Sequence, residues 1–402
     1  MKRKDTKYKL HEDTLLATLG RPKKVDFGTV NTPVSRASTI TFKSLKKFLD
    51  ADARSIKKLA SPSSRSFSYG RSSNSTTLSL RNAINNLENA YATLLTNSGL
   101  SAITTTLLSL LKSGDHLLVS DSVYNPVKKS CDYFFTRLNI ETTYYNPLIG
   151  SEIKKLFKKN TKVVFMESPG SLTFDMIDIP AIVKESKKSN IKTVVDNTWA
   201  TPLLFRPLDY DVDVSLMAIT KYVSGHADIM MGSIAVNKKS WKEVASGYLS
   251  LANAVSPDDA YLSLRGLRTM GIRLKQHQKN AKIVANWLKK HPLVTKIMYP
   301  ALPSDPGYKI WKKYYKGASG LFGFIIKPCP VRKIQAMLAS LNHFSMGFSW
   351  GGYESLLIPT NIQATRNVTK WPTNGNSFRI HIGLEDPNDL IQDLKKGFNK
   401  LK

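Results

Sequence analysis

Residues 191–221 read IKTVVDNTWATPLLFRPLDYDVDVSLMAITK and contain two short apolar runs, at 191–195 and 212–217. Apolar runs of this length, separated by mixed segments, indicate buried strands. Polar residues follow both of them, Asp196 after the first and Lys221 after the second. The stretch therefore predicts two strands of an inner sheet with reactive side chains beyond their ends.

The same alternation continues on the N-terminal side of this stretch. We predict further strands over 91–96, 116–120 and 163–166, and helices over 102–111, 151–159 and 180–188. Strands that alternate with helices imply a parallel sheet covered on both faces. The central part of the chain is thus expected to be an α/β domain, which we place at residues 73–267.

The two ends of the chain have a different character. Residues 1–72 are polar and irregular around Phe42, Leu45 and Phe48, which indicates an arm that packs on another body, such as a second subunit. Residues 268–402 are expected to form a smaller α+β domain. Its strands are predicted over 321–326 and 377–382, and its helices over 331–341 and from residue 386.

A long helix joins the two predicted domains. Ser256 is a good N-cap, and Pro257 suits the first helical turn. The helix is predicted to continue to about residue 292, with an interruption or a bend at Gly266 and Gly271.

Composition and charge limit the class of protein. The chain has 402 residues, of which 42% are apolar and 22% charged, which is typical of a globular enzyme and excludes a disordered or fibrous chain. The net charge of +29 would allow a nucleic-acid partner. Because the basic residues are spread along the chain, without a basic tail, we predict a solvated basic surface and no nucleic-acid partner.

The sequence contains few signals for a metal site, a disulfide or a membrane segment. The chain has 2 cysteines, Cys131 and Cys329, without metal-ligand spacing, so we predict no metal site and no disulfide framework. The basic residues at 1–4 are not followed by an apolar segment, and no apolar run reaches membrane-spanning length. A cytoplasmic protein without a membrane partner is expected.

In a sheet of this kind, ligands bind beyond the carboxyl ends of the strands. Lys221 stands there and is expected to be desolvated, which would lower the pKa of its amine and let it form a Schiff base. Asp196 could keep a pyridinium nitrogen protonated, as pyridoxal phosphate chemistry requires. The plainer alternatives are a surface lysine and an ordinary Asp196-Asn197 turn.

Two other segments suit ligand binding. Asn97–Ser101 could hold a phosphate, with Gly99 and Leu100 at a helix N-terminus, although Ser98 is equally a simple N-cap. GxGxxG and GxxxxGK[ST] motifs are absent from the sequence. Arg379 in a C-terminal strand could clamp a substrate carboxylate or belong to an internal ion pair.

These residues carry a resemblance to a known family. The segments that match are 146–150, 165–171, 195–200, 213–226, 265–269 and 344–354. They resemble the Cys/Met-metabolism enzymes, which depend on pyridoxal phosphate, and the SWGGYES segment at 349–355 resembles the β-lyase branch in particular. The resemblance implies fold type I, similar to aspartate aminotransferase, with a mainly parallel seven-stranded sheet, an N-terminal arm and a smaller α+β domain.

The resemblance also implies roles. Lys221 would form the Schiff base and move protons, Asp196 would pair with the pyridine nitrogen, and Tyr124 would stack on the ring and belong to the catalytic set. The phosphate would be held by Gly99, Leu100 and Thr220 and by Tyr69 and Arg71 of a neighbouring subunit, whereas Arg379, Ser349 and Trp350 would bind the substrate. A dimer with shared sites, within a tetramer, would follow.

The implied reaction is β-elimination on the sulfur amino acid L-cystathionine in methionine biosynthesis. The alternatives are alanine racemisation and γ-lyase or γ-synthase activity, and the alternative from another class is nucleic-acid binding. The sequence departs from the family at Ala218, where serine is usual, at Ala227 and at Phe348, where tyrosine is common. These departures concern cofactor affinity and substrate range.

Overall fold

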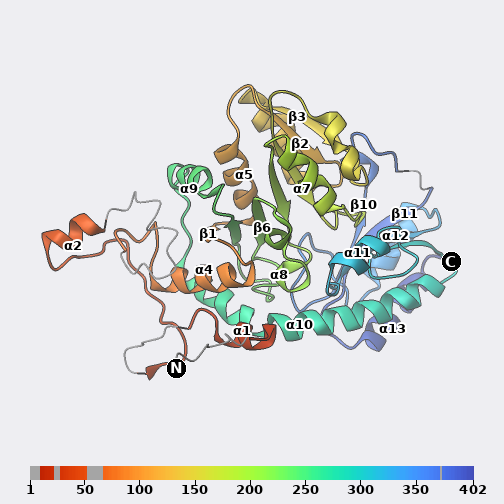
Figure 1. Cartoon of the computed structure of the whole chain (residues 1–402). Coiled ribbons are helices and arrows are strands. Elements are labelled where there is room, and N and C mark those ends of the chain that lie inside the picture. Colours follow the sequence, from red (N-terminus) through yellow and green to blue (C-terminus); the bar gives the residue numbers. More distant parts are fainter. Residues whose placement is uncertain (1–9, 22–27, 52–66, 372–373) are drawn as a thin grey trace, which may run out of the picture.

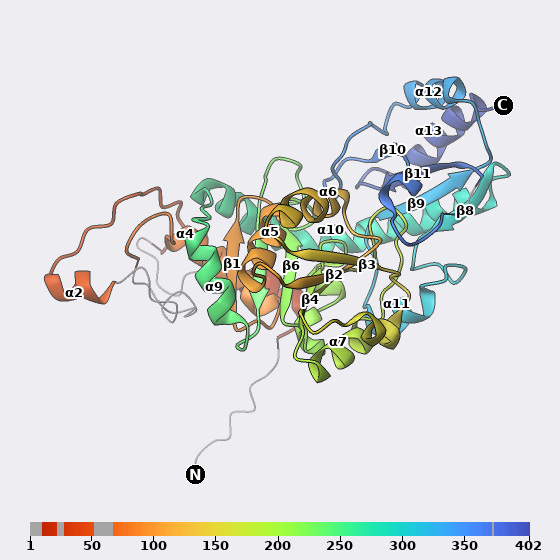
Figure 2. The same cartoon turned by 90° about the horizontal axis from the view of Figure 1, so that it is seen from above.

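The computed structural model describes residues 10–21, 28–51, 67–371 and 374–402, so part of the predicted arm lies outside the described residues. Two helices of the arm are described, α1 (Glu12–Thr18) and α2 (Leu45–Asp50). α1 packs against the long helix α10 (Pro257–Lys290) of the same chain. α2 extends away from the body of the molecule in both views (Figures 1 and 2).

Among the described residues, the larger sheet has seven strands in the order β1-β7-β6-β5-β4-β2-β3. Neighbouring strands are parallel, except that β7 runs antiparallel to both β1 and β6. The prediction of a mainly parallel seven-stranded sheet is therefore confirmed. The strands are β1 (Ala92–Thr96), β2 (His116–Ser120), β3 (Glu141–Tyr145), β4 (Thr161–Glu167), β5 (Lys192–Asp196), β6 (Val214–Ala218) and β7 (Gly232–Val236).

Both faces of this sheet are covered, which explains why its inner strands read as continuous apolar runs. On β4, Val163 and Phe165 pack with the helices α5 (Gly99–Leu110) and α9 (Trp241–Ser250). Val164 and Met166, which point to the opposite face, pack with α7 (Ile179–Lys188). The segment predicted as a helix over 151–159 is instead a 3₁₀ helix over Gly150–Leu156.

The C-terminal part forms a second, antiparallel sheet in the order β10-β11-β9-β8. This confirms the smaller α+β unit. Its strands are β8 (Val294–Met298), β9 (Leu321–Ile326), β10 (Leu356–Thr360) and β11 (Asn376–His381), and its helices are α11 (Tyr308–Tyr314), α12 (Val331–Ala339) and α13 (Pro387–Asn399). The remaining α-helices described are α4 (Ser75–Leu87), α6 (Asn125–Lys129) and α8 (Thr201–Leu204).

Helix α10 runs below both sheets and contacts α1, α4, β8 and α13 (Figure 1). The predicted interruption at its glycines is wrong, because the helix is continuous from Pro257 to Lys290. The glycines serve close packing instead. A Cβ on Gly266 would lie 2.2 Å from the carbonyl oxygen of Ser224, and one on Gly271 would lie 2.9 Å from Leu16. The proposed domain boundary at 267/268 falls inside this helix.

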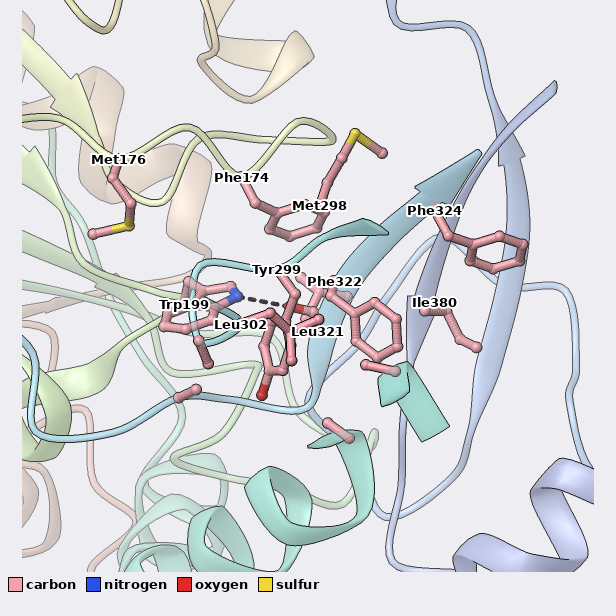
Figure 3. Packing of buried hydrophobic residues seen from close by; sticks show 14 of the residues in the cluster. Phe174, Met176, Trp199, Met298, Tyr299, Leu302, Leu321, Phe322, Phe324 and Ile380 are labelled. Atoms are coloured by element: carbon pink, nitrogen blue, oxygen red, sulfur yellow. Dashed lines mark hydrogen bonds between the residues drawn. The ribbon is translucent and has the colours of Figure 1, made fainter. Parts of the chain in front are cut away.

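A single apolar core continues from the large sheet into the small one (Figure 3). Trp199, just beyond β5, donates a hydrogen bond from Nε1 to the carbonyl oxygen of Leu321 in β9 (2.9 Å). The Tyr299 and Phe322 rings lie 5.0 Å apart in the same core. Because close-packed side chains join the two units, the position of β11 is fixed relative to the carboxyl ends of the large sheet. No helix in the described part of the chain is both long and apolar enough to cross a membrane.

Candidate active site

Polar side chains from both units meet at the carboxyl edge of the large sheet. Glu167 ends β4, and its register partner Asp196 ends β5. Lys221 follows the end of β6 by three residues. The small unit supplies Ser349 and Arg379, so the chain brings a base, carboxylates and a cation to one place.

Lys221 lies at the centre of this group. Its Nζ donates a hydrogen bond to Ser349 Oγ (2.9 Å) and lies 5.2 Å from the centre of the Trp350 ring. Burial, and next the charge of Arg379, lower the pKa of Lys221 to about 8, although Asp196 opposes this change. A lysine with this pKa is partly neutral near physiological pH and can act as a nucleophile or a base.

The segment that carries Trp350 rests directly on the lysine. Gly351 has φ +88°, and a Cβ there would lie 3.0 Å from the Lys221 backbone. Any other residue at 351 would combine an unfavourable backbone conformation with a steric clash. Gly351 therefore serves the close approach of this segment to Lys221.

Asp196 is held by Thr198. Its Oδ1 accepts hydrogen bonds from Thr198 N (2.9 Å) and Thr198 Oγ1 (2.5 Å), and the same hydroxyl accepts one from Ala218 N (2.9 Å). Burial raises the pKa of Asp196, and the Thr198 hydrogen bonds oppose that rise. Within the described chain Oδ2 has no hydrogen bond. Thr198 was not predicted as a site residue, although a hydroxyl two residues after an aspartate is a known turn signal.

Tyr124 presents its ring at the edge of the site. The side chain is 46% exposed, and its backbone N–H donates to Glu167 Oε2 (2.6 Å). Burial of the phenol and the charge of Glu167 raise the pKa of Tyr124, whereas Arg379 lowers it. Burial, followed by the charge of Asp196, raises the pKa of Glu167 well above the usual range.

Arg379 is a half-buried cation with backbone partners. Its Nη2 donates to the carbonyl oxygens of Gly347, Phe348 and Ser349 at 3.0–3.3 Å. Burial lowers the pKa of Arg379 to about 10. In the described residues no carboxylate forms an ion pair with Arg379, so the alternative of an internal ion pair has no partner there. The guanidinium can still receive a carboxylate through its other N–H groups.

The predicted phosphate cradle lies at the N-terminus of α5. Ser98 caps this helix by accepting from Ser101 N (3.0 Å), and the N–H groups of the first turn have no acceptor within the helix. A Cβ on Gly99 would lie 2.6 Å from Ala218 Cβ, so only glycine fits between α5 and β6. The hydroxyl of Thr220 donates to Met231 O (3.2 Å), so it would have to exchange partners to donate to a phosphate.

Two groups of predicted residues lie apart from this set. Tyr69 is exposed and forms an isolated β-bridge with Thr39 of the same arm. Arg71 is exposed as well, and its positive charge opposes the rise in the pKa of Tyr248. Within the described chain, no hydrogen bond or ion pair joins either residue to Lys221. Asp121, a further strand-end carboxylate, accepts the backbone N–H groups of residues 367–369 and so joins the two units.

Comparisons with known proteins agree with this geometry. Residues 13–399 match the model of the family described as Cys/Met metabolism PLP-dependent enzyme. The chain belongs to this family. It is 38% identical to the cystathionine β-lyase of Escherichia coli over 395 residues, which cover 97% of this chain and 98% of the relative. It is also 38% identical to the L-alanine/L-glutamate racemase of Wolbachia pipientis over 396 residues, 98% of each chain.

A solved structure shares the fold. The crystal structure of metB from Corynebacterium glutamicum matches with a TM-score of 0.87 and 28% identity, over 97% of this chain and 98% of that one. Membership of the family confirms that the protein is an enzyme that depends on pyridoxal phosphate.

The residues present suit this cofactor. Asp196 keeps one carboxylate oxygen without a partner in the described chain, which a pyridinium N–H can use. The glycine-lined start of α5 can receive the phosphate, the exposed Tyr124 ring can stack on the pyridine, and Lys221 can bind the carbonyl carbon.

Proposed function

We propose that this enzyme is a cystathionine β-lyase, which converts L-cystathionine and water into L-homocysteine, pyruvate and ammonia. The observation that carries the proposal is the environment of the Lys221 amine. Its pKa is lowered, it donates a hydrogen bond to Ser349, and it lies beside the Trp350 ring. The β-lyase names among the relatives with 36–43% identity support the choice within the family.

Arg379 binds the substrate α-carboxylate in this proposal. Its guanidinium is fixed by three backbone carbonyls and has N–H groups left for a second partner. A bidentate carboxylate bond would orient the amino acid with its Cα–H toward Lys221. Ser349, which bonds the Lys221 amine, and Trp350 limit where that amine can move.

Lys221 moves the protons. Its neutral amine removes the proton from Cα, and its ammonium form then protonates the departing sulfur as the Cβ–S bond breaks. Pyridoxal phosphate, when bound, supplies the electron sink that makes the Cα proton acidic. Asp196, held by Thr198, keeps the pyridine nitrogen protonated, which strengthens that sink. Water then releases ammonia and pyruvate from the remaining three-carbon unit.

Racemisation is the second candidate, because one relative is named an L-alanine/L-glutamate racemase. Alanine has no β-leaving group, so it cannot undergo β-elimination, and a proton removed by Lys221 can return to Cα. Return from the opposite face would invert the amino acid. Chiral analysis of alanine incubated with the enzyme distinguishes this activity from β-elimination.

We also propose a homodimer with shared sites, within a tetramer, in the cytoplasm. The exposed Tyr69 and Arg71, and the apolar side chains of Leu45, Phe48 and Leu49 on α2, support a second copy as their partner. The two cysteines are unpaired, which suits a reducing compartment. A small sulfur amino acid, and no nucleic acid, is the proposed partner of the site.

The test is the keto acid released from L-cystathionine by the cofactor-loaded enzyme. We expect pyruvate, and we expect Lys221→Ala to abolish its release because the Lys221 amine removes the Cα proton in the proposed reaction. Release of 2-oxobutyrate would instead assign a γ-lyase. Pyruvate release that survives in Lys221→Ala would contradict the role of this lysine.

A further inference from the structure

Two side chains of strand β11 form hydrogen bonds with residues 347–354, a segment that lies against Lys221. Arg379 and His381 are two residues apart, so they lie on the same face of the strand. Arg379 donates to the carbonyl oxygens of residues 347–349, at the start of the segment. The Nε2 of His381 accepts the N–H of Gly351 (3.0 Å), and its Nδ1 bonds the carbonyl oxygen of Glu354 (3.0 Å), at the other end.

These hydrogen bonds define the state of the imidazole. A carbonyl oxygen can only accept, so Nδ1 carries the proton and donates it to Glu354 O. A backbone N–H can only donate, so Nε2 must be unprotonated to accept from Gly351. His381 is 1% exposed, and burial, together with the neighbouring His277, keeps its pKa well below the usual range. The ring therefore bonds both groups in its neutral form.

The segment held in this way carries the contacts of Lys221. Ser349 Oγ is 2.9 Å from the amine, and the Trp350 ring is 5.2 Å from it. Gly351, whose N–H His381 accepts, is the residue that rests on the Lys221 backbone. A displacement of Gly351 would therefore move both contacts of the amine at once.

Aromatic rings support His381 from behind. The Tyr222 ring lies 6.0 Å from His381 and 5.6 Å from Trp350, and the His277 ring lies 5.3 Å from His381. The Tyr222 hydroxyl accepts the N–H of Gly320 (3.0 Å), which connects this group to the small sheet. The imidazole is thus held in position by its surroundings.

We propose that His381 is a positioning residue, which holds the segment 349–354 against Lys221 and so fixes Ser349 and Trp350 beside the amine. The proposal rests on the proposed function for its catalytic consequence. Its structural part, the hydrogen bond from Gly351 to His381, is independent of the substrate. His381 touches neither the reacting atoms nor the amine in this arrangement, so it acts through the segment alone.

The test uses His381→Phe, which keeps a ring and removes both hydrogen bonds. We expect kcat to fall about 10- to 100-fold with KM changed less than about threefold, because the amine is misplaced while Arg379 still binds the carboxylate. In the cofactor-free protein, hydrogen exchange of the 345–356 peptide should accelerate roughly tenfold, because Gly351 loses its acceptor. His381→Gln, whose amide oxygen can accept from Gly351, should restore most of kcat and most of the protection of the 345–356 peptide from exchange.

The matched control is His116→Phe. His116 is equally buried, with both ring nitrogens hydrogen-bonded to threonines, but it lies at the start of β2, away from the site. It should leave kcat and the 345–356 exchange unchanged. Unaltered exchange in His381→Phe, or an equal loss of kcat in His116→Phe, would overturn the proposal. Failure of wild-type enzyme to release pyruvate would affect only the proposed function, since the exchange experiment needs no substrate.

Discussion

Burial of Lys221 lowers the stability of the folded protein and also makes the amine more reactive. Its pKa is lowered from 10.5 to about 8, chiefly by burial, so the folded protein disfavours the charged amine. Between these two pKa values the unfolded chain binds more protons than the folded one, so stability rises as the pH rises through this window. Below pH 8 the full penalty is present, and it amounts to at most about 3 kcal/mol.

We therefore predict that Lys221→Met stabilises the cofactor-free protein at pH 7. Methionine fills a similar volume without a charge to desolvate, although it loses the hydrogen bond to Ser349. The gain should shrink as the pH approaches 10.5, because the folded-state amine is then neutral and the unfolded-state amine is losing its proton as well. Urea unfolding at pH 7 and pH 10 measures the difference between the two proteins. A difference that does not change with pH would show that the lysine is not desolvated.

At the scale of elements, the start of α5 determines the shape of the proposed phosphate cradle. Gly99 lies so close to β6 that a Cβ would be 2.6 Å from Ala218 Cβ. We predict that Gly99→Ala pushes the helix N-terminus away from the strand, with a cost of about 1–3 kcal/mol in stability, and weakens cofactor binding. Thermal unfolding and cofactor titration by absorbance measure the two effects.

The double variant Gly99→Ala/Ala218→Gly is the control for this contact. It removes the opposing methyl group, so both stability and cofactor affinity should recover beyond the sum of the single changes. Simple additivity would show that the contact between residues 99 and 218 does not determine the cradle.

The elements also show where sequence patterns suffice. The inner strand β2 matched its predicted bounds, because it is buried on both faces and reads as a short apolar run between turns. Strand β3 was missed because it lies at the edge of the sheet, and its sequence ETTYY is partly exposed and polar. Strand β7 was missed because it begins with Gly232, which a strand pattern does not favour.

The candidate site also contains some residues that the sequence could predict and others that it could not. Lys221, Asp196 and Arg379 could be proposed from the sequence, because each follows or interrupts an apolar strand at a position where a charge needs a reason. Thr198 and His381 could not, since their importance depends on which backbone groups the fold brings beside them. Local patterns carry no information about partners 20 or more residues away.

At the scale of the whole molecule, the described part of the arm exposes surface that the proposed dimer would cover. Tyr69 and Arg71 are exposed, and α2 extends from the body with Leu45 72% exposed (Figure 2). If the arm of one subunit completes the phosphate site of another, each site draws Lys221 from one chain and Arg71 from the other.

This arrangement predicts complementation between two defective variants. Arg71→Ala should lose most activity through weaker phosphate binding, and Lys221→Ala should lose all of it. Co-assembly of the two gives mixed dimers in which one site has both residues intact. With random mixing about half of the dimers are mixed, so about a quarter of all sites should recover. Pyruvate release from co-expressed and co-purified chains measures the recovery.

Lys221→Ala mixed with Asp196→Ala is the matched control, because both residues come from the same chain in every site. Each site of such a mixed dimer carries one defect, so no activity should return. Recovery in this control would mean that subunits exchange whole active-site units. No recovery when Lys221→Ala is mixed with Arg71→Ala would mean that the arm serves the site of its own chain. Recovery confined to the Arg71 pair is the outcome that only a shared site can give, since neither parent chain holds both groups.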